Sequence, residues 1–257
     1  DVFQPRFSPD GLEVAYLEER TTLKVLNLAT GASRVVLEGG RSYSYADGDQ
    51  WYEWSPDGRW FLLTSLSPGR WSNEVLLVPS SGRGEPVNLT RSGYEDNVPR
   101  WAFKGEGMFW ATDRQGPRGH SGWGGWDDIH VMFFTEASWD RFRLSEAEFA
   151  QVKAADEKAE KAKKKKDGPA EDVEPSKPKL AEQVELDLER REDRTRRLTI
   201  HSAPIAAAAL TPDGERLLYL ARFERGFDLW SYLHRGSEMK LLAKLDAESA
   251  GGLEIDA

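Results

Sequence analysis

The side chains best suited to chemistry or binding in this chain lie in the stretch DRQGPRGHSGWGGWDD, residues 113–128. It places five glycines, two tryptophans, two arginines and a histidine in one connection. Tryptophan and arginine contribute strongly at binding interfaces, and loops on a rigid scaffold often carry such residues. We therefore predict that this loop contacts a peptide through Arg118, His120, Trp123 and Trp126. The indoles would lie on apolar peptide side chains, and the guanidinium would meet a carboxylate or backbone carbonyl.

Two other interpretations of this loop stay open. It could be a long flexible connection between strands, or it could pack against another domain of a larger protein. The stretch GGRSYSYADGDQW, residues 39–51, is similarly polar and aromatic and is a second candidate for binding.

The sequence carries no recognisable catalytic motif. It has no Gly-x-Ser-x-Gly elbow, no His-Glu-x-x-His, no P-loop and no dinucleotide-binding glycine pattern. The four histidines are scattered, and the absence of cysteine excludes thiol catalysis and disulfides. DGD at 47–49 lacks the further spaced oxygens of a calcium loop, so it is interpreted as a turn. We predict no catalytic residue, no cofactor and no metal site in this chain.

A repeat determines how these loops are positioned. FSPDG stands at 7–11, WSPDG at 54–58 and LTPDG at 210–214, with a degenerate copy, WAFKGEG, at 101–107. The residues before these turns are 47, 47 and 109 positions apart. A fixed period of this size is typical of repeat architectures.

Each repeat contains four short apolar runs separated by turn residues, which predicts four antiparallel strands. This is the content of one β-propeller blade. We predict an all-β protein with four blades at 1–45, 46–92, 93–200 and 201–246, forming an open arc of a larger ring. A further copy begins at the C-terminal GGLEIDA. The aromatic residues beside each turn should fill the seams between blades, whereas Asp57 should be a solvated turn residue whose loss costs little stability.

The third repeat contains an insertion, because 109 exceeds 47 by 62 residues. We assign 136–182 to this insertion and expect it to project from the arc. Residues 144–166 predict a solvated helix that starts with a capping box between Ser145 and Glu148. A proline- and acid-rich stretch predicted to be disordered follows, and strand-like sequence returns at VELDLE and RRLTI.

Charge excludes two classes of partner. The formal net charge is −9, and residues 153–197 hold 14 basic against 13 acidic side chains despite their lysine run. Nucleic-acid binding is therefore not expected. No apolar run approaches the length of a transmembrane helix and no signal peptide opens the chain, so membrane insertion is not expected either.

The repeat resembles propellers of the TolB and tricorn type. Longer strings, among them YSYADGDQWYEWSPDGRW, LTRSGYEDNVPRW, the segment from Asp113 to Glu148 and EDRTRRLT, resemble the N-terminal propeller of bacterial tricorn-like serine peptidases. The resemblance spans the whole chain. It implies a fragment of a periplasmic peptidase in which propellers filter or channel peptides towards PDZ and Ser/His catalytic domains. No position here matches the family's nucleophile or base, so no catalytic residue is carried over.

The partners implied by this resemblance are peptides or unfolded polypeptides and the PDZ and protease domains of the same chain, with a homo-oligomer left open. Two other classes remain as alternatives. One is a TolB-like scaffold that binds a protein partner in the cell envelope, and the other is the propeller of a prolyl-oligopeptidase-like enzyme.

Overall fold

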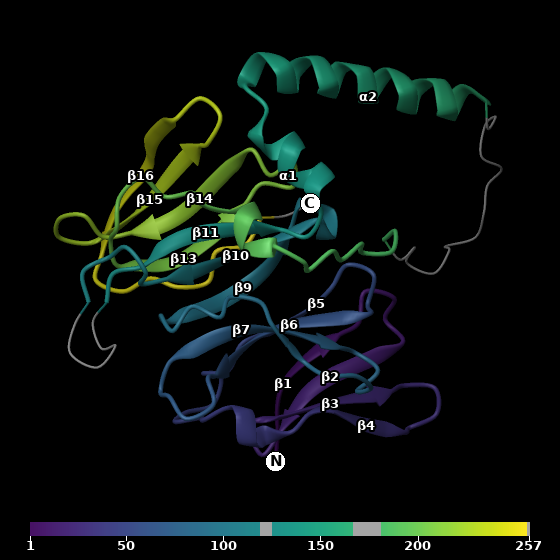
Figure 1. Ribbon diagram of the computed structural model, residues 1–257. Helices are drawn as coiled ribbons and strands as arrows, with labels where there is room; N and C mark the ends of the chain where they lie inside the picture. The colour runs from purple at the N-terminus through teal and green to yellow at the C-terminus, as the bar shows by residue number, and fades with distance from the viewer. Residues whose placement is uncertain (119–124, 167–180, 256–257) are drawn as a thin grey trace.

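The computed structural model describes residues 1–118, 125–166 and 181–255. It confirms the all-β prediction, because its strands form four separate four-stranded antiparallel sheets, each ordered as in the sequence. Figure 1 shows the first two sheets together at one end of the molecule and the last two at the other. We call the sheets blades 1 to 4 in chain order.

The strands of blades 1 and 2 are β1 (Val2–Phe7), β2 (Glu13–Glu18), β3 (Thr22–Asn27), β4 (Ser33–Leu37), β5 (Tyr52–Trp54), β6 (Trp60–Leu66), β7 (Asn73–Pro79) and β8 (Val87–Asn88). Those of blades 3 and 4 are β9 (Asp96–Ala102), β10 (Gly107–Thr112), β11 (Asp128–Phe133), β12 (Thr195–Arg197), β13 (Ile205–Leu210), β14 (Arg216–Ala221), β15 (Phe227–Leu233) and β16 (Glu238–Ala247). Two helices, α1 (Glu136–Arg143) and α2 (Glu146–Lys166), lie between β11 and β12.

The Pro-Asp-Gly turns join the first and second strands of blades 1, 2 and 4. In each turn the glycine N–H donates to the carbonyl three residues earlier, at 2.9, 2.9 and 2.7 Å in chain order. The glycine has a φ of 70° in blades 1 and 2, a value that side-chain-bearing residues rarely adopt. The Asp side chain accepts the backbone N–H two residues later. The same residue types therefore build the same turn three times.

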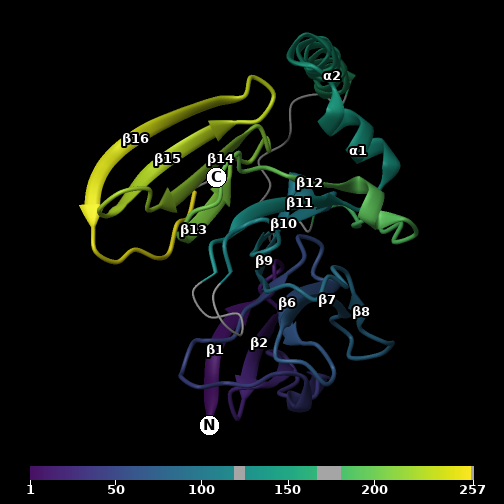
Figure 2. The ribbon, with the colours of Figure 1, turned by 60° about the vertical axis from the view of Figure 1, so that its left-hand side comes forward.

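The core consists of three apolar clusters, each of which joins two neighbouring blades. Trp54 lies in the seam between blades 1 and 2, where it is 7% exposed and donates its indole N–H to the Arg6 carbonyl at 3.2 Å. Trp101 and Leu210 are partly buried in the next two seams. Phe7 was expected in a seam, but it is 69% exposed because no blade precedes β1 in the described part of the chain. No described cluster joins blade 4 to blade 1, and Figure 2 shows them apart.

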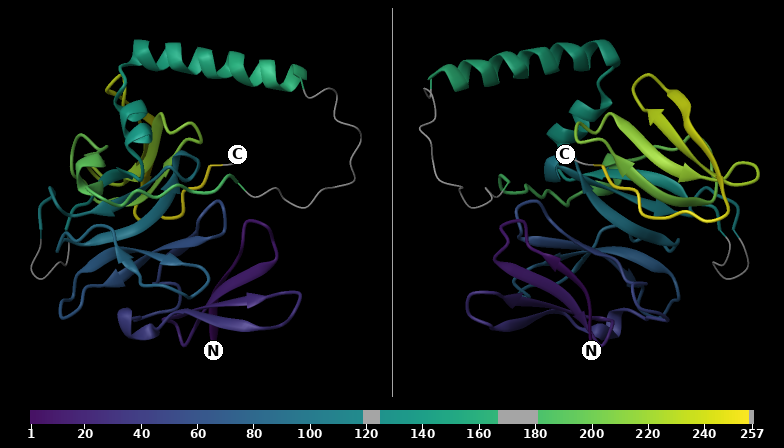
Figure 3. Two further views of the ribbon diagram at one scale, coloured as in Figure 1. Left: turned by 45° about the vertical axis from the view of Figure 1, so that its right-hand side comes forward. Right: turned by 180° about the vertical axis from the view of Figure 1, so that it is seen from behind.

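The insertion only partly follows its prediction. The helix α2 begins with the expected capping box, since Glu148 accepts the Ser145 N–H at 2.9 Å and Ser145 accepts the Glu148 N–H at 3.4 Å. It extends away from the sheets and its described side chains are mostly exposed (Figure 3). The expectation that all of 136–182 projects is wrong for α1. There Phe142 is 4% exposed and packs on Phe133 with 4.7 Å between ring centroids.

The chain returns from the insertion without forming the strand expected at VELDLE. Residues 181–188 form no strand, and they cross from blade 2 to blade 3. Val184 is buried and donates its N–H to Asp57 at 2.8 Å, while Asp187 donates to the Phe134 carbonyl at 2.9 Å. Asp57 is accordingly 6% exposed, so the expectation of a solvated turn residue is wrong. The stretch 167–180, predicted to be disordered, lies outside the described residues.

Truncation of the seam tryptophan should be costly. Trp54→Ala would remove a nearly buried indole and leave a cavity between blades 1 and 2, so we expect the free energy of unfolding to fall by about 3–5 kcal/mol. Trp71→Ala is the matched control, because Trp71 is 73% exposed and its loss should change stability by less than about 0.5 kcal/mol. Urea unfolding of the three proteins measures both values. Equal losses for the two variants would contradict the seam assignment.

Asp57→Ala should destabilise more than the same change in the equivalent turn of blade 1. Both aspartates accept a local serine hydroxyl and backbone N–H, but only Asp57 is buried and also accepts the Val184 N–H. Removing a buried acceptor leaves its donor unsatisfied, which costs about 1–3 kcal/mol. Asp10→Ala isolates the local contribution and should cost less. Identical unfolding midpoints for the two variants would show that the contact to Val184 adds nothing.

Candidate functional site

The two ends of the blades differ in what they carry. We call the end with the Pro-Asp-Gly turns and the insertion the turn face. The opposite end, which we call the loop face, holds the connections between blades and those between the second and third strands of each blade. Figure 1 shows the two ends, with α2 at one and the described parts of the β10–β11 connection, residues 113–118 and 125–127, at the other. Both loops singled out from the sequence, 39–51 and 113–128, belong to the loop face.

The described parts of loop 113–128 form a stem that is closed by backbone contacts. The Trp126 N–H donates to the Pro117 carbonyl at 2.9 Å. A Cβ on Gly116 would come within 1.9 Å of the Trp126 carbonyl oxygen, so only glycine fits there. This close backbone contact accounts for the glycine at position 116, and no bound ligand is needed to explain it. Trp126 itself is 44% exposed.

Arg118 already has an aromatic partner. Its guanidinium lies 4.3 Å from the centre of the Tyr94 ring, and Arg114 lies 5.3 Å from the same ring. The sequence prediction did not include Tyr94, which holds the stem in place through these cation–π contacts. His120 and Trp123, the other two predicted contacts, lie outside the described residues. The structure thus brings Arg118 and Trp126 to one face but does not test their binding role.

Beside this stem lies an aromatic cleft of about 650 Å³ that belongs to blades 2 and 3. Its exposed walls are Tyr43, Tyr45 and Trp71, which are 52%, 73% and 73% exposed. The Tyr43 ring contacts both others edge to face, with centroids 4.6 Å from Tyr45 and 5.6 Å from Trp71. Exposed aromatic groups of this kind mark interaction surfaces.

Trp51 forms the inner wall of the cleft, and contacts from both neighbouring blades fix its ring. Its indole N–H donates to the Pro99 carbonyl at 2.7 Å, which ties blade 2 to blade 3. Two guanidiniums lie against its ring, those of Arg6 at 4.9 Å and Arg100 at 5.6 Å. At the rim, Val98 has a φ of 51°, an uncommon conformation for a β-branched residue, within an irregularity of strand β9.

The floor of the cleft is polar. The Asn73 N–H donates to Glu95 at 3.2 Å, and the Asn73 side-chain amide donates to Asn97 at 2.8 Å. Burial raises the pKa of Glu95, and the negative charges of Asp113, Asp96 and Glu74 add to this effect. Glu95 also connects the cleft to the loop stem, because its backbone N–H donates to Asp113 at 3.0 Å.

Two adjacent aspartates at the base of the stem have opposite environments. Asp128 is fully buried and pairs with Arg197 at 2.6 Å, and it also accepts hydroxyl hydrogen bonds from Thr199 and Ser202. Asp127 has no described cationic partner. Burial raises its pKa to about 6, helped by the neighbouring charges of Asp113, Asp128 and Glu95.

Two of the described histidines, His130 and His234, are buried. Burial lowers the pKa of both His130 and His234 to about 4, so both are neutral at physiological pH. His130 contacts the Gln115 side chain at 2.8 Å, and His234 contacts the Glu215 carbonyl at 3.1 Å. None of the described histidines is hydrogen-bonded to a serine or threonine hydroxyl. Within the same residues, no group of three or more potential ligands is arranged to hold a metal ion.

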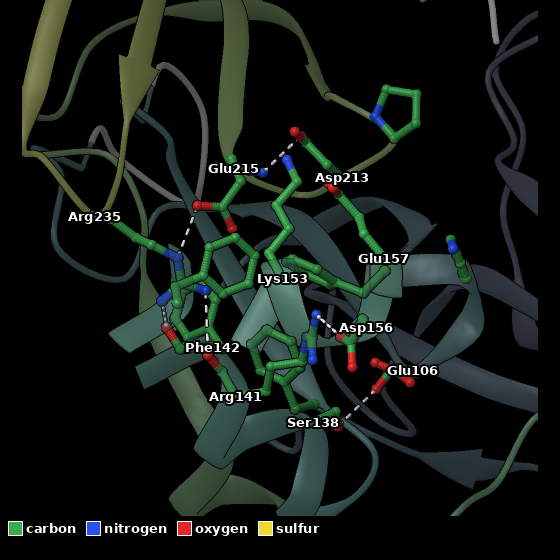
Figure 4. Close-up of a pocket in the computed structure, with 15 residues that line it drawn as sticks. Glu106, Ser138, Arg141, Phe142, Lys153, Asp156, Glu157, Asp213, Glu215 and Arg235 are labelled. Carbon is green, nitrogen blue, oxygen red and sulfur yellow. Dashed lines mark hydrogen bonds and ion pairs between the residues drawn. The ribbon is translucent and has the colours of Figure 1, made fainter. Parts of the chain in front are cut away.

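A second cavity, of about 470 Å³, lies on the turn face between α1, α2 and the β13–β14 turn (Figure 4). Four of its charged side chains form two ion pairs, one of which joins α1 to α2. Arg235 pairs with Glu215 at 2.7 Å and donates to the Phe142 carbonyl at 2.8 Å, while Arg141 pairs with Asp156 at 2.8 Å. These contacts hold the helices on blade 4, and the loop face, with both loops singled out from the sequence, carries the candidate site.

Trp71 lines the cleft but was not among the residues singled out from the sequence. It lies in SPGRWSN, the connection between the second and third strands of blade 2, which corresponds to loop 113–128 of blade 3. A tryptophan inside a Pro-Gly turn, away from any strand, was the signal that could have found it. The second candidate loop, 39–51, proves to supply Tyr43, Tyr45 and Trp51 to the cleft.

The two adjacent aspartates should respond oppositely to removal of their charge. Because the folded state raises the pKa of Asp127 from 3.8 to about 6, its ionisation costs stability as pH rises from about 4 through 6. Asp127→Asn should therefore be more stable than the parent by on the order of 1–2 kcal/mol at pH 8, and this gain should vanish below pH 4.

The matched control is Asp128→Asn, which loses the ion pair to Arg197 and should destabilise the protein at pH 8. Urea titrations at pH 4 and pH 8 measure both effects. A stability gain for Asp127→Asn that does not change with pH would contradict the assignment.

The comparisons with known proteins concern the fold alone. The sequence matches no protein-family model, and no curated protein matches it either. Among solved structures, TolB from Acinetobacter baumannii is 17% identical with a TM-score of 0.53 over 96% of this chain. Putative TolB from Agrobacterium tumefaciens is 16% identical with a TM-score of 0.54 over 95%. The tricorn protease is 12% identical with a TM-score of 0.61 over 95%.

This chain spans less than two thirds of each of these proteins, covering 45%, 62% and 22% of their respective lengths. No helix in the described residues is long and apolar enough to cross a membrane. At these identities the likeness shows architecture, and it agrees with the four sheets and their order. The chain is a β-propeller of the type found in TolB and the tricorn protease.

Proposed function

We propose that this chain is a non-catalytic propeller module that binds extended polypeptide segments on its loop face. Within a periplasmic serine-type peptidase, such a module would admit or channel peptides towards a separate catalytic domain. The periplasmic location and the serine-type chemistry rest on the resemblance of the sequence motifs.

The aromatic cleft is the observation that carries this proposal. Tyr43, Tyr45 and Trp71 are exposed to water in contact with one another, although an aromatic ring is stabilised by burial. Their neighbours Asn73 and Asn97 offer amide groups that can pair with a peptide backbone. Apolar walls with a few fixed polar groups are the usual composition of a binding site.

The structural neighbours support a place in a peptidase. Besides the tricorn protease, a puromycin-hydrolyzing peptidase from Mycobacterium tuberculosis is similar in fold, with a TM-score of 0.52 and 11% identity over 95% of this chain. This chain covers 31% of that peptidase. A propeller that forms a minor part of a peptidase can bind the peptide substrate before it reaches the catalytic domain.

The likeness to TolB supports a second candidate, an interaction scaffold for a protein partner. In that case the same cleft would hold a segment of the partner. The two candidates differ in selectivity, because a channel must accept many unfolded sequences whereas a scaffold recognises one.

The first candidate predicts that the chain binds an unfolded polypeptide more tightly than its folded form. Reduced and carboxymethylated α-lactalbumin, labelled with a fluorophore, is a suitable probe in an anisotropy titration, with the native protein as competitor. Trp71→Ala should weaken binding about tenfold, since loss of an aromatic anchor typically costs more than 1 kcal/mol.

Leu28→Ala is the matched control, because Leu28 is an exposed apolar residue, 47% accessible, on the turn face. It should leave the affinity unchanged. Absence of binding by the parent chain, or equal weakening in both variants, would refute the proposal for the loop face.

A further inference from the structure

The aromatic cleft has an unusual balance of charge for a site that contacts peptides. Two carboxylates, Asp49 and Glu95, line it, and no lysine or arginine does so among the described residues. The rest of its lining is aromatic, aliphatic or amide-bearing. The guanidiniums nearest the cleft, those of Arg6 and Arg100, lie on the ring of Trp51, and Arg100 is paired with Glu53. The charged side chains that line the cleft itself therefore favour a cation.

Three further carboxylates, those of Glu74, Asp96 and Asp113, lie behind the floor of the cleft and strengthen its preference for a cation. Glu95 is close enough to Glu74, Asp96 and Asp113 for their charges to raise its pKa. Neutral donors hold Glu74 and Asp96: Thr90 donates to Glu74 at 2.6 Å, and the Trp110 indole donates to Asp96 at 2.8 Å. None of the four carboxylates forms an ion pair with a described residue. A cleft with walls of one sign concentrates ligands of the opposite charge.

The aromatic walls provide a matching surface. Arginines of the chain itself lie on two other rings of this face: Arg118 lies on Tyr94 beside the cleft, and Arg6 lies on Trp51 at its inner wall. No described cation lies on the rings of Tyr43, Tyr45 or Trp71, which remain exposed. Because these rings meet edge to face, they form differently oriented walls, an arrangement that recognises ammonium groups through cation–π attraction.

The walls are also held in place before any ligand arrives. The Ala46 N–H donates to the Asp49 carboxylate at 3.0 Å, and the Gln50 side-chain amide donates to the Tyr43 carbonyl at 3.0 Å. These bonds close the segment that carries both tyrosines. A wall that is already ordered adds less entropy cost on binding.

We propose that the aromatic cleft binds the lysine or arginine side chain of a peptide, with the cationic group between the rings of Tyr43, Tyr45 and Trp71 and facing the carboxylate of Glu95. The proposal rests on the peptide-binding function above and names the residue class that this site selects. An anionic ligand such as a phosphate is disfavoured by the same carboxylates.

The test compares three peptides that differ at one central position, which holds lysine, norleucine or glutamate in an otherwise identical acetylated and amidated Ala/Ser/Gly sequence. Each competes with a labelled unfolded polypeptide for the chain at pH 8 and low ionic strength. We expect the lysine peptide to bind at least tenfold more tightly than the norleucine peptide and the glutamate peptide to bind most weakly. Added salt should reduce the difference.

Glu95→Gln separates charge from shape, because the amide oxygen can still accept the Asn73 N–H. It should reduce the preference for lysine over norleucine to less than about threefold while leaving norleucine binding unchanged. Glu146→Gln, an exposed change on the turn face, should retain the full preference. Thermal melting of each variant reports whether it is folded.

The outcomes distinguish the two levels of the proposal. If the labelled polypeptide binds but lysine and norleucine peptides compete equally, the charge preference is wrong and the peptide-binding function stands. If Glu95→Gln is folded and keeps the full preference, the assignment to this cleft is wrong. If the labelled polypeptide does not bind the parent chain at all, the proposed function fails and this inference fails with it.

Discussion

Burial of each blade against its neighbour is the interaction on which the rest of this structure depends. The strands of blade 2 are apolar on both sides, with Leu62, Leu77 and Phe61 inaccessible to water, and such a sheet is not stable unless both faces are covered. The three inter-blade clusters supply that cover. Because the faces of the blades are buried against one another, insertions and binding residues can be accommodated only at the two ends of the blades. Both the insertion and the candidate site lie there.

The turn face shows how a blade accepts a large insertion without losing its seams. The helix α1 is fixed at its C-terminal end by Arg235, whose side chain is 4% exposed and which donates to the carbonyls of Arg141 and Phe142. The last carbonyls of a helix lack partners within the helix, and Arg235 supplies donors to them. The returning chain is fixed by Asp57, which gives a repeated turn residue a second, tertiary role. The insertion is thus attached at both ends, and among its described residues only α2 extends from the propeller.

Sequence reasoning was most successful where a local rule determines the structure. The period of 47 residues predicted four sheets, and the pattern at Ser145 and Glu148 predicted the start of α2, because both depend on neighbours in the chain. It failed where the partner is distant in sequence. Asp57 has the same local motif as Asp10, and only the fold brings Val184 to it, across 127 positions. The aromatic cleft was missed as a unit for the same reason, since Trp71 and the tyrosines come from separate loops.

The loop face contains aromatic residues in two states, and the contrast between them argues for function. Arginine side chains of this chain lie on the rings of Trp51 and Tyr94, and these contacts join neighbouring elements. Tyr43, Tyr45 and Trp71 contact one another, and no described cation lies on their rings. Trp71 and the stem of loop 113–128 occupy corresponding connections of adjacent blades, and Glu95 lies between them. An extended segment that crosses the seam would therefore reach the cleft on blade 2 and Trp126 on blade 3 together, so the repeat itself can align the two halves of one binding surface.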